Sequence, residues 1–332
     1  MNFAISHDAL IESLCRLRNR LSVSYMPAQV AALAIRNNLW FTRYYIARSL
    51  EAIQSWLNEE ALSPYLQSCA PARSAKKIGI ITAGNVPLVG FHDVMTALLC
   101  GHIAWVRASH QDRVLLEWVL QQWAELLPAL AQRIAFVQEM NRVDFLLATG
   151  SNNTARQLNA QHAHTPRLIR HNRFSVALLN GAESDAQLQS LNDDIFLYNG
   201  LGCRNVSNLL VTPDFDIKRW IDILDGYPGT QLNALYLEKL TWERARIGLL
   251  QQPCIPTKNV LIKHSNALDF ARMGIIYLIK VKSISEAEKI VREHGNHIQC
   301  VVNLDTKTGK TQIPALNDFA DDIDTLKLFS EL

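Results

Sequence analysis

The sequence predicts an α/β protein in which a parallel sheet is covered by helices on both faces, followed by a second, smaller α/β region. Short apolar runs rich in β-branched residues alternate with amphipathic stretches from residue 78 onward, and short turns containing Gly, Pro or Asn separate them. Parallel strands buried on both faces read as such continuous apolar runs. The 332 residues, of which 48% are hydrophobic and 19% charged, suffice for two compact regions.

The first region begins with helices and continues with alternating strands and helices. Apolar residues recur at three- and four-residue spacing across residues 6–66, which predicts helices there, and a polar, basic connector follows at 68–77. Ser109 is a plausible N-cap for one of the later helices. The expected strands are 78–83, 103–107, 134–138, 144–150 and 175–180, and the helices between them are 88–100, 112–127 and 152–161.

The second region is expected to start near residue 181. A helix over 184–199, with Ser184 as a possible cap, stops at Gly200-Leu201-Gly202. The remaining strands are predicted at 206–211, 259–263, 275–281 and 300–303, with helices within 216–251 and at 285–293. The predicted organisation is therefore 1–180, 181–310 and a C-terminal segment, 311–332.

Composition argues against several classes of function. The 33 basic and 31 acidic residues are mixed along the chain and give a net charge of +2, so no basic face for nucleic acid is expected. No secretory apolar region and no run of about 18 apolar residues occurs, which predicts a cytoplasmic protein without a membrane span. The six cysteines lack metal-ligand spacing, so we expect reduced thiols and no metal site.

Cys203 stands out among these cysteines because glycines precede it in GLGCRN (200–205). Gly200 and Gly202 permit positive φ angles and leave the thiol uncrowded at a helix-to-strand bend, where it could act as a nucleophile. The alternative is a glycine C-cap before a buried cysteine. The preceding helix end carries partial negative charge, which raises a thiol pKa, and Arg204 is expected to face away. The origin of the thiolate stays open at this stage.

Asn85 lies in a turn, Gly84–Pro87, at the carboxyl end of the first predicted strand, where ligands of parallel sheets bind. Its amide could donate to a developing oxyanion; an ordinary Asn turn is the alternative. His92 and Asp93 follow in the next helix, where we expect His92 to be a packing residue and Asp93 a surface or capping group.

Two further strand ends carry candidate anion-binding residues. Thr149, Gly150 and Ser151 follow a strand and open a helix, where free N–H groups favour a pyrophosphate; a simple Ser cap is the alternative. Arg107 and Ser109 could grip a phosphate or form a solvated surface pair. No GxGxxG fingerprint of a conventional dinucleotide site is present.

Taken together, these segments resemble the acyl-CoA reductases of the luciferase-operon type, a branch of the aldehyde dehydrogenase superfamily. The resemblance implies an aldehyde-dehydrogenase-like fold, with a Rossmann-like cofactor domain and a smaller α/β catalytic domain. Its most specific blocks are GNVPLVGFHD (84–93) and GLGCRNVS (200–207). The other matching segments are 101–109, 148–156, 169–179, 298–302 and 312–329.

By this resemblance, Cys203 is the nucleophile that accepts the acyl group, and Asn85 stabilises the oxyanion together with the Cys203 N–H. The implied reaction reduces an acyl thioester, from acyl-CoA or an acyl-carrier protein, to an aldehyde. An enzyme working in the oxidative direction and a catalytically silent subunit of a biosynthetic complex are the alternatives. The resemblance to the superfamily also implies a homo-oligomer.

The resemblance also implies a nicotinamide cofactor. The implied cofactor residues are Gly84, Arg107, Ser109, Thr149, Gly150 and Ser151. Arg107 replaces the family's usual Lys near the adenine ribose and could pair a 2′-phosphate, so NADPH is expected, with NADH not excluded. The superfamily's water-activating Glu would fall near residues 178–181, which read Leu-Leu-Asn-Gly, and its ribose-binding EEIFGP segment is not recognisable near 270–275.

Overall fold

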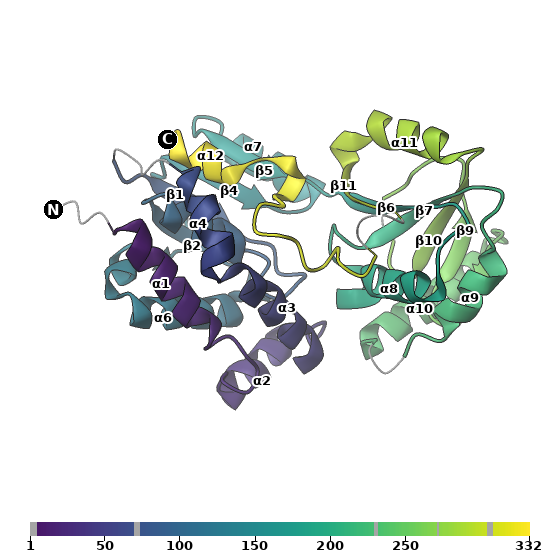
Figure 1. The fold of residues 1–332 in the computed structure, drawn as a ribbon, viewed down its shortest axis with the longest axis horizontal. Helices are drawn as coiled ribbons and strands as arrows, with labels where there is room; N and C mark the ends of the chain where they lie inside the picture. The colour runs from purple at the N-terminus through teal and green to yellow at the C-terminus, as the bar shows by residue number, and fades with distance from the viewer. Residues whose placement is uncertain (1–4, 70–73, 229–231, 271, 304–307) are drawn as a thin grey trace. The chain divides into compact units, whose positions relative to one another are not determined.

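The computed structural model describes residues 5–69, 74–228, 232–270, 272–303 and 308–332, and these form two compact units (Figure 1). One unit comprises residues 1–172 and 315–332, and the other comprises 173–314. Each unit contains one sheet. The division falls before strand β6 (Phe174–Leu179), which the sequence analysis assigned to the first region, because β6 pairs with strands of the second sheet. Residues 70–73 of the expected connector lie outside the described ranges.

The first sheet is fully parallel, as the sequence predicted. Its spatial order, β3-β2-β1-β4-β5, is that of a doubly wound α/β fold. The strands are β1 (Lys77–Ile81), β2 (Ile103–Arg107), β3 (Ile134–Phe136), β4 (Phe145–Thr149) and β5 (Arg167–Arg170).

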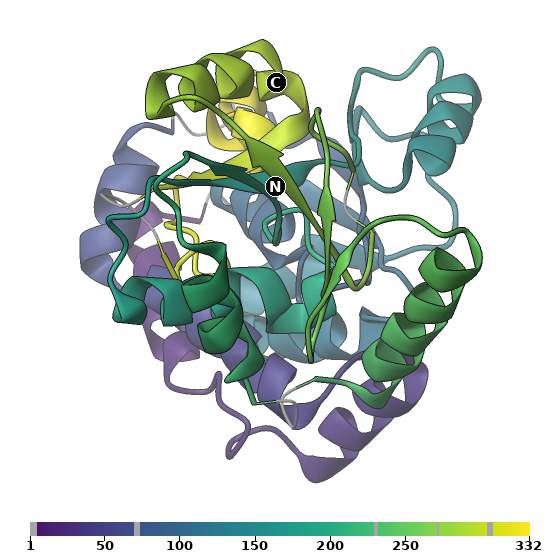
Figure 2. The same cartoon turned by 90° about the vertical axis from the view of Figure 1, so that its right-hand side faces the viewer.

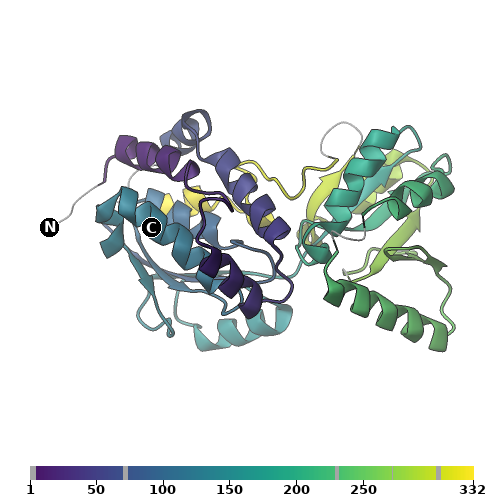
Figure 3. The same cartoon turned by 90° about the horizontal axis from the view of Figure 1, so that it is seen from below.

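Helices cover both faces of this sheet. Ile78 and Ile80 of β1 join the large core formed with α5 (Phe91–Leu99) and α6 (Arg113–Leu126), whereas Ile81 joins a smaller cluster with α7 (Asn152–Gln161). Successive side chains of a strand point to opposite faces, so these two clusters mark the two faces. Figure 3 shows the strands of this unit between the helical layers.

Within residues 5–69 and 74–76, four helices precede β1, which confirms the helical prediction for residues 6–66. They are α1 (His7–Arg18), α2 (Ala28–Asn37), α3 (Arg43–Trp56) and α4 (Glu59–Gln67). Side chains of Ser6, Thr42 and Asn58 accept hydrogen bonds from backbone N–H groups and cap α1, α3 and α4. Near the C-terminus, η5 (Ala320–Asp322) and α12 (Thr325–Ser330) belong to the same unit, and His102 Nε2 lies 2.7 Å from the Phe329 carbonyl oxygen.

The second sheet has the order β11-β6-β7-β10-β9-β8, in which only the β8–β9 pairing is antiparallel among the described strands. In Figure 1, α11 (Ile284–Glu293) lies on one side of β6 and β7 (Val206–Val211), and α8 (Asp185–Phe196) and α9 (Ile217–Asp225) lie on the other. Figure 2 shows α10 (Ala234–Leu249) beside the end of the sheet that carries β9 (Leu261–His264), where Tyr236 donates to the Asn259 carbonyl. The remaining strands are β7 (Val206–Val211), β8 (Ile255–Pro256), β9 (Leu261–His264), β10 (Ile275–Lys280) and β11 (Ile298–Val302).

The helices of the second unit also follow the predicted order. They are α8 (Asp185–Phe196), α9 (Ile217–Asp225), α10 (Ala234–Leu249) and α11 (Ile284–Glu293). Short 3₁₀ segments occur at η2 (Leu197–Gly200) and η4 (Gly295–His297) here, and at η1 (Pro128–Gln132) in the first unit. Across the described ranges, no helix is long and apolar enough to cross a membrane.

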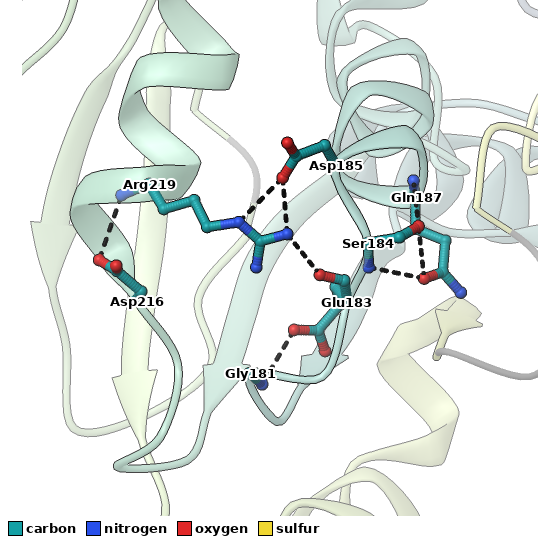
Figure 4. A network of polar contacts seen from close by, with 7 residues as sticks. All are labelled: Gly181, Glu183, Ser184, Asp185, Gln187, Asp216 and Arg219. Atoms are coloured by element: carbon teal, nitrogen blue, oxygen red, sulfur yellow. Dashed lines mark hydrogen bonds and ion pairs between the residues drawn. The ribbon is translucent and has the colours of Figure 1, made fainter.

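The turn from β6 to α8 is held by a dense polar network (Figure 4). Ser184 caps α8 in a capping box with Gln187, which confirms the predicted cap. The Glu183 carboxylate accepts the N–H groups of Asn180 and Gly181 at 2.7 and 2.9 Å. Arg219 of α9 donates to the Glu183 carbonyl and to Asp185. The carboxyl end of β6 is therefore occupied by structural contacts.

Candidate active site

The turns that the sequence analysis placed at strand ends lie together along one edge of the first sheet. Ile81 is in register with Arg107 on one side and with Ala148 on the other. The segments that follow β1, β2 and β4 therefore leave the sheet side by side. This brings the turn at Gly84, the β2 end at Arg107 and the β4 end at Thr149 to the same edge.

Gly84 and Ser109 are in direct contact. A Cβ added to Gly84 would lie 2.4 Å from Ser109 Oγ, so this approach requires glycine. The Ser109 N–H donates to Thr82 Oγ1 at 3.3 Å. The predicted role of Ser109 as the N-cap of α6 is wrong, because the helix starts at Arg113 and its N-cap position is Asp112.

The backbone around Asn85 is fixed by three buried side chains from other elements. Asn38 Nδ2 donates to the Gly84 carbonyl at 2.8 Å, and Ser49 Oγ donates to the Pro87 carbonyl at 2.5 Å. Both carboxylate oxygens of Asp112 accept the Leu88 N–H, at 2.9 and 3.0 Å. Leu88 has a φ of +60°, a left-handed conformation that is costly for a non-glycine residue. Tertiary contacts thus hold a turn that would not persist alone.

Asp112 is buried, and burial raises the pKa of its carboxyl well above the ordinary value, partly offset by the hydrogen bond from Leu88. Desolvation disfavours the ionised form, and the Leu88 N–H compensates for it in part. The carboxyl of Asp112 is consequently a titratable support for the Asn85 turn.

As predicted, the Thr149–Ser151 turn connects the end of a strand, β4, to the start of a helix, α7. Ser151 Oγ accepts the Thr154 N–H at 3.2 Å and caps α7, and a Cβ on Gly150 would lie 2.9 Å from Thr154 Cγ2. Burial and then the positive charges of Arg107 and Arg167 lower the pKa of His162, at the end of α7. By strand register, the β2 end at Arg107 and the start of α7 leave the same edge of the sheet, and a guanidinium and a helix N-terminus both favour an anion.

Asp93 forms a buried ion pair, so its prediction as a surface or capping group is wrong. Its two carboxylate oxygens accept from Arg170 at 2.7 and 3.0 Å, and both residues are buried. The bidentate pairing offsets the cost of burying the charges. Because Asp93 lies in the first turn of α5, the pair ties the helix that follows the Asn85 turn to the end of β5. His92 lies 2.9 Å from the Leu316 carbonyl oxygen and packs against Trp56, in agreement with its predicted packing role.

Cys203 is the one exposed cysteine of the six, all of which are described. This rules out the alternative of a buried cysteine after a C-cap. The Asn205 N–H donates to the Gly202 carbonyl at 3.1 Å, and the Gly202 N–H donates to Asn205 Oδ1 at 2.8 Å. These reciprocal bonds close a tight turn around Cys203. Arg204 Nη1 lies 3.3 Å from Cys300 Sγ of β11.

Ser175 connects the Cys203 turn to the sheet. Its buried hydroxyl donates to the Cys203 carbonyl at 2.9 Å and accepts the Cys300 N–H at 3.1 Å. Ser175 lies at the amino end of β6. Residues 178–181, where the resemblance puts the superfamily's water-activating Glu, begin at the other end of this strand. The residues just before β6, 171–173, are His-Asn-Arg and contain no carboxylate either.

Sequence reasoning missed the residues that support the two turns. Asn38, Ser49 and Asp112 carry no local signal, since each acts on a distant segment. Asn205 was within a noted motif, but its contacts depend on the end of α8. Near 270–275, Asn208 and Asp269 exchange two hydrogen bonds of 2.9 and 3.0 Å, while residue 271 lies outside the described ranges.

Comparisons with solved structures identify the fold. A benzaldehyde dehydrogenase from Corynebacterium glutamicum, described as NAD-dependent, is 12% identical over 92% of this chain and 82% of its own, with a TM-score of 0.65. The aldehyde dehydrogenase KauB from Pseudomonas aeruginosa is 14% identical over 92% and 78%, with a TM-score of 0.64. A propionaldehyde dehydrogenase from Clostridium phytofermentans is 12% identical over 90% and 83%, with a TM-score of 0.58. The fold is therefore aldehyde-dehydrogenase-like, as predicted.

The comparison with protein-family models identifies the family. No curated protein sequence matches the chain. The family model described as acyl-CoA reductase (LuxC) matches residues 46–219, more than half of the chain, and includes both the Asn85 and the Cys203 turns. The chain therefore belongs to the acyl-CoA reductase (LuxC) family of oxidoreductases, within the aldehyde dehydrogenase superfamily.

Proposed function

We propose that this protein reduces an acyl thioester, from acyl-CoA or an acyl-carrier protein, to an aldehyde, with Cys203 as the nucleophile and NADPH as the reductant. The observation that carries the proposal is the exposed thiol of Cys203 in a closed turn of the family's GLGCRNVS block. An exposed thiol on a rigid turn suits covalent catalysis, because it can reach a carbonyl carbon without rearrangement of the backbone.

In the first step, the Cys203 thiolate attacks the thioester carbonyl carbon. The Asn85 amide and the Cys203 N–H, assigned by family resemblance, would donate hydrogen bonds to the oxyanion. Collapse breaks the bond to the thiol of the donor, which leaves and takes up a proton, and the acyl group remains on Cys203 Sγ. The rigid support of the Asn85 turn suits this role, since a preorganised donor needs no reorientation during the reaction.

The acyl group must then survive until it is reduced. The strand end bonded to Cys203 presents a serine, Ser175, and the three residues before β6 include no carboxylate that could activate water. A missing base at this strand end favours reduction over hydrolysis of the thioacyl group.

The first unit offers residues that fit a nicotinamide dinucleotide. Arg107, the hydroxyls of Thr149 and Ser151 and the start of α7 would hold its phosphates, and the close contact of Gly84 with Ser109 shapes the same edge. Arg107 favours a 2′-phosphate and hence NADPH, with NADH as the alternative. When bound, the nicotinamide would supply a hydride to the thioacyl carbon, and cleavage of the bond between that carbon and Cys203 Sγ would release the aldehyde and return the thiolate.

The test is to trap the acyl-enzyme. Incubation with a panel of acyl-CoAs without nucleotide should add one acyl mass to the wild type and to Cys254→Ala, a matched thiol control, and none to Cys203→Ala. Adding NADPH should discharge the acyl group as aldehyde. Acyl mass on Cys203→Ala would overturn the assignment, and a folded wild type that neither acylates nor oxidises NADPH would favour the silent subunit.

A further inference from the structure

The carboxyl end of α8 presents an electrostatic problem for a thiolate at residue 203. The last carbonyl groups of a helix lack helical partners and carry the negative end of its macrodipole. A nearby negative potential disfavours thiolate and slows a cysteine nucleophile. In this chain α8 ends at Phe196, η2 follows, and Cys203 comes three residues after η2.

Asn205 lies between the helix end and the Cys203 turn. Its Nδ2 donates to the carbonyls of Leu197 at 2.9 Å, Asp194 at 3.1 Å and Ile195 at 3.3 Å. Its Oδ1 accepts the Gly202 N–H at 2.8 Å. All contacts of Nδ2 are carbonyl oxygens and that of Oδ1 is an N–H, so the amide orientation is determined by its partners.

We infer that Asn205 is a positioning residue that sets the reactivity of Cys203, by neutralising the carbonyl end of α8 and closing the turn that carries the thiol. This inference rests on the proposed nucleophilic role of Cys203. Asn205 is only 2% exposed, so its hydrogen bonds act where solvent screens little. Its amide turns its positive end toward the helix carbonyls.

Several ionisable groups lie on the elements around this turn and would be shared by every variant. Arg204 contacts Cys300 of β11. Arg173, before β6, donates to the Ile298 carbonyl at 3.0 Å. Asp193 and Asp194 lie on α8, where the Asp194 carboxylate accepts from Gly309 and Thr311. Comparison of variants at residue 205 in one background therefore isolates the effect of the amide.

The experiment measures alkylation of Cys203 by iodoacetamide between pH 5 and 10, followed by peptide mass spectrometry and without acyl-CoA. Asn205→Ala, which removes the cap, and Asn205→Asp, which adds a negative charge, should both move the alkylation midpoint upward. A shift of one pH unit lowers the rate on the acidic side about tenfold. Asn205→Ser, whose hydroxyl can donate one hydrogen bond, should shift the midpoint less than Ala and serves if the larger changes prevent folding.

Asn259→Asp is the matched control. Asn259 is also buried, and its Nδ2 donates to the Leu224 and Tyr227 carbonyls at the end of α9. This variant should lose stability while the Cys203 profile stays at the wild-type midpoint.

Wild-type alkylation in Asn205→Ala, or a shift confined to Asn205→Asp, would overturn the inference. Because the assay contains no acyl-CoA, its outcome is independent of whether Cys203 accepts an acyl group. Failure of the proposed function would appear in the acylation assay alone.

Discussion

The Asn85 turn and the Cys203 turn are stabilised in different ways. The backbone of the Asn85 turn is bonded to side chains 46, 38 and 24 residues away, those of Asn38, Ser49 and Asp112. The Cys203 turn is closed by one of its own residues, Asn205, and is anchored by Ser175. The first turn therefore depends on side chains of three distant segments, whereas the second is closed by hydrogen bonds within the turn itself and is anchored by one residue, Ser175, 28 positions away.

This difference matches the chemistry proposed for each turn. A neutral amide donor must be oriented toward the oxyanion, and a rigid surrounding structure maintains that orientation. The negative charge of a thiolate must be stabilised, and the dipoles immediately around the sulfur determine whether it is. Distant substitutions should consequently affect Asn85 more than Cys203, and substitutions within residues 202–205 should do the reverse.

The largest effect is expected when the amide of the first turn is removed. Asn85→Ala should slow acylation by about 10²–10³-fold, because loss of one oxyanion donor typically has that effect, while acyl-enzyme still forms. Single-turnover acylation followed by mass spectrometry measures this rate. Asn141→Ala, on an exposed loop of the same unit, is the control. Acylation of Asn85→Ala at the wild-type rate would remove Asn85 from the mechanism.

A smaller loss is expected when the distant support is removed. Asn38→Leu deletes the donor to the Gly84 carbonyl and should slow acylation about tenfold, because small misplacements of a catalytic group have large effects on rate. The alkylation profile of Cys203 should not change. If the profile moved as much as in Asn205→Ala, the two turns would not be independent and the comparison would fail.

The sequence predicted the architecture well, because that information is local. Apolar runs, turn residues and caps such as Ser184 identified the strands and helices, and the matching blocks nominated Cys203 and Asn85 as site residues, which stays a prediction. Parallel pairing followed from the alternation of strands and helices.

What the sequence did not reveal depends on contacts between distant segments. Asp93 reads as a surface residue on a helix, and only the fold places Arg170 beside it, 77 residues away. Serine is a common N-cap residue, but Ser109 instead lies against Gly84, and α6 starts only at Arg113. Likewise, only the hydrogen bond from Ser175 to the Cys203 carbonyl shows that Cys203 lies at the amino end of β6.

Ser175→Ala tests how far the anchoring of the second turn matters. The change leaves the Cys203 carbonyl and the Cys300 N–H without this buried partner, which should lower the free energy of unfolding by about 1–3 kcal/mol. Because the reciprocal bonds between Gly202 and Asn205 remain, acylation should fall only a few-fold. Ser265→Ala, at a half-buried site of the same unit, provides the control in urea unfolding. A loss of acylation as large as that of Asn85→Ala would show that the turn is not self-contained.

The smallest effect on catalysis is expected from Asp112→Asn, which keeps one oxygen for the Leu88 N–H and removes the titration. Burial raises the pKa of Asp112 above its ordinary value of 3.8, so the folded state holds the proton more tightly than the unfolded state. The stability contributed by this group is therefore complete below the ordinary value and is lost as the pH rises through the higher pKa of the folded state. Urea unfolding at pH 5 and pH 8 should show the wild type losing stability relative to Asp112→Asn as the pH rises. An equal difference at both pH values would mean that the carboxyl does not titrate between them, and that the first turn is held by contacts insensitive to pH over this range.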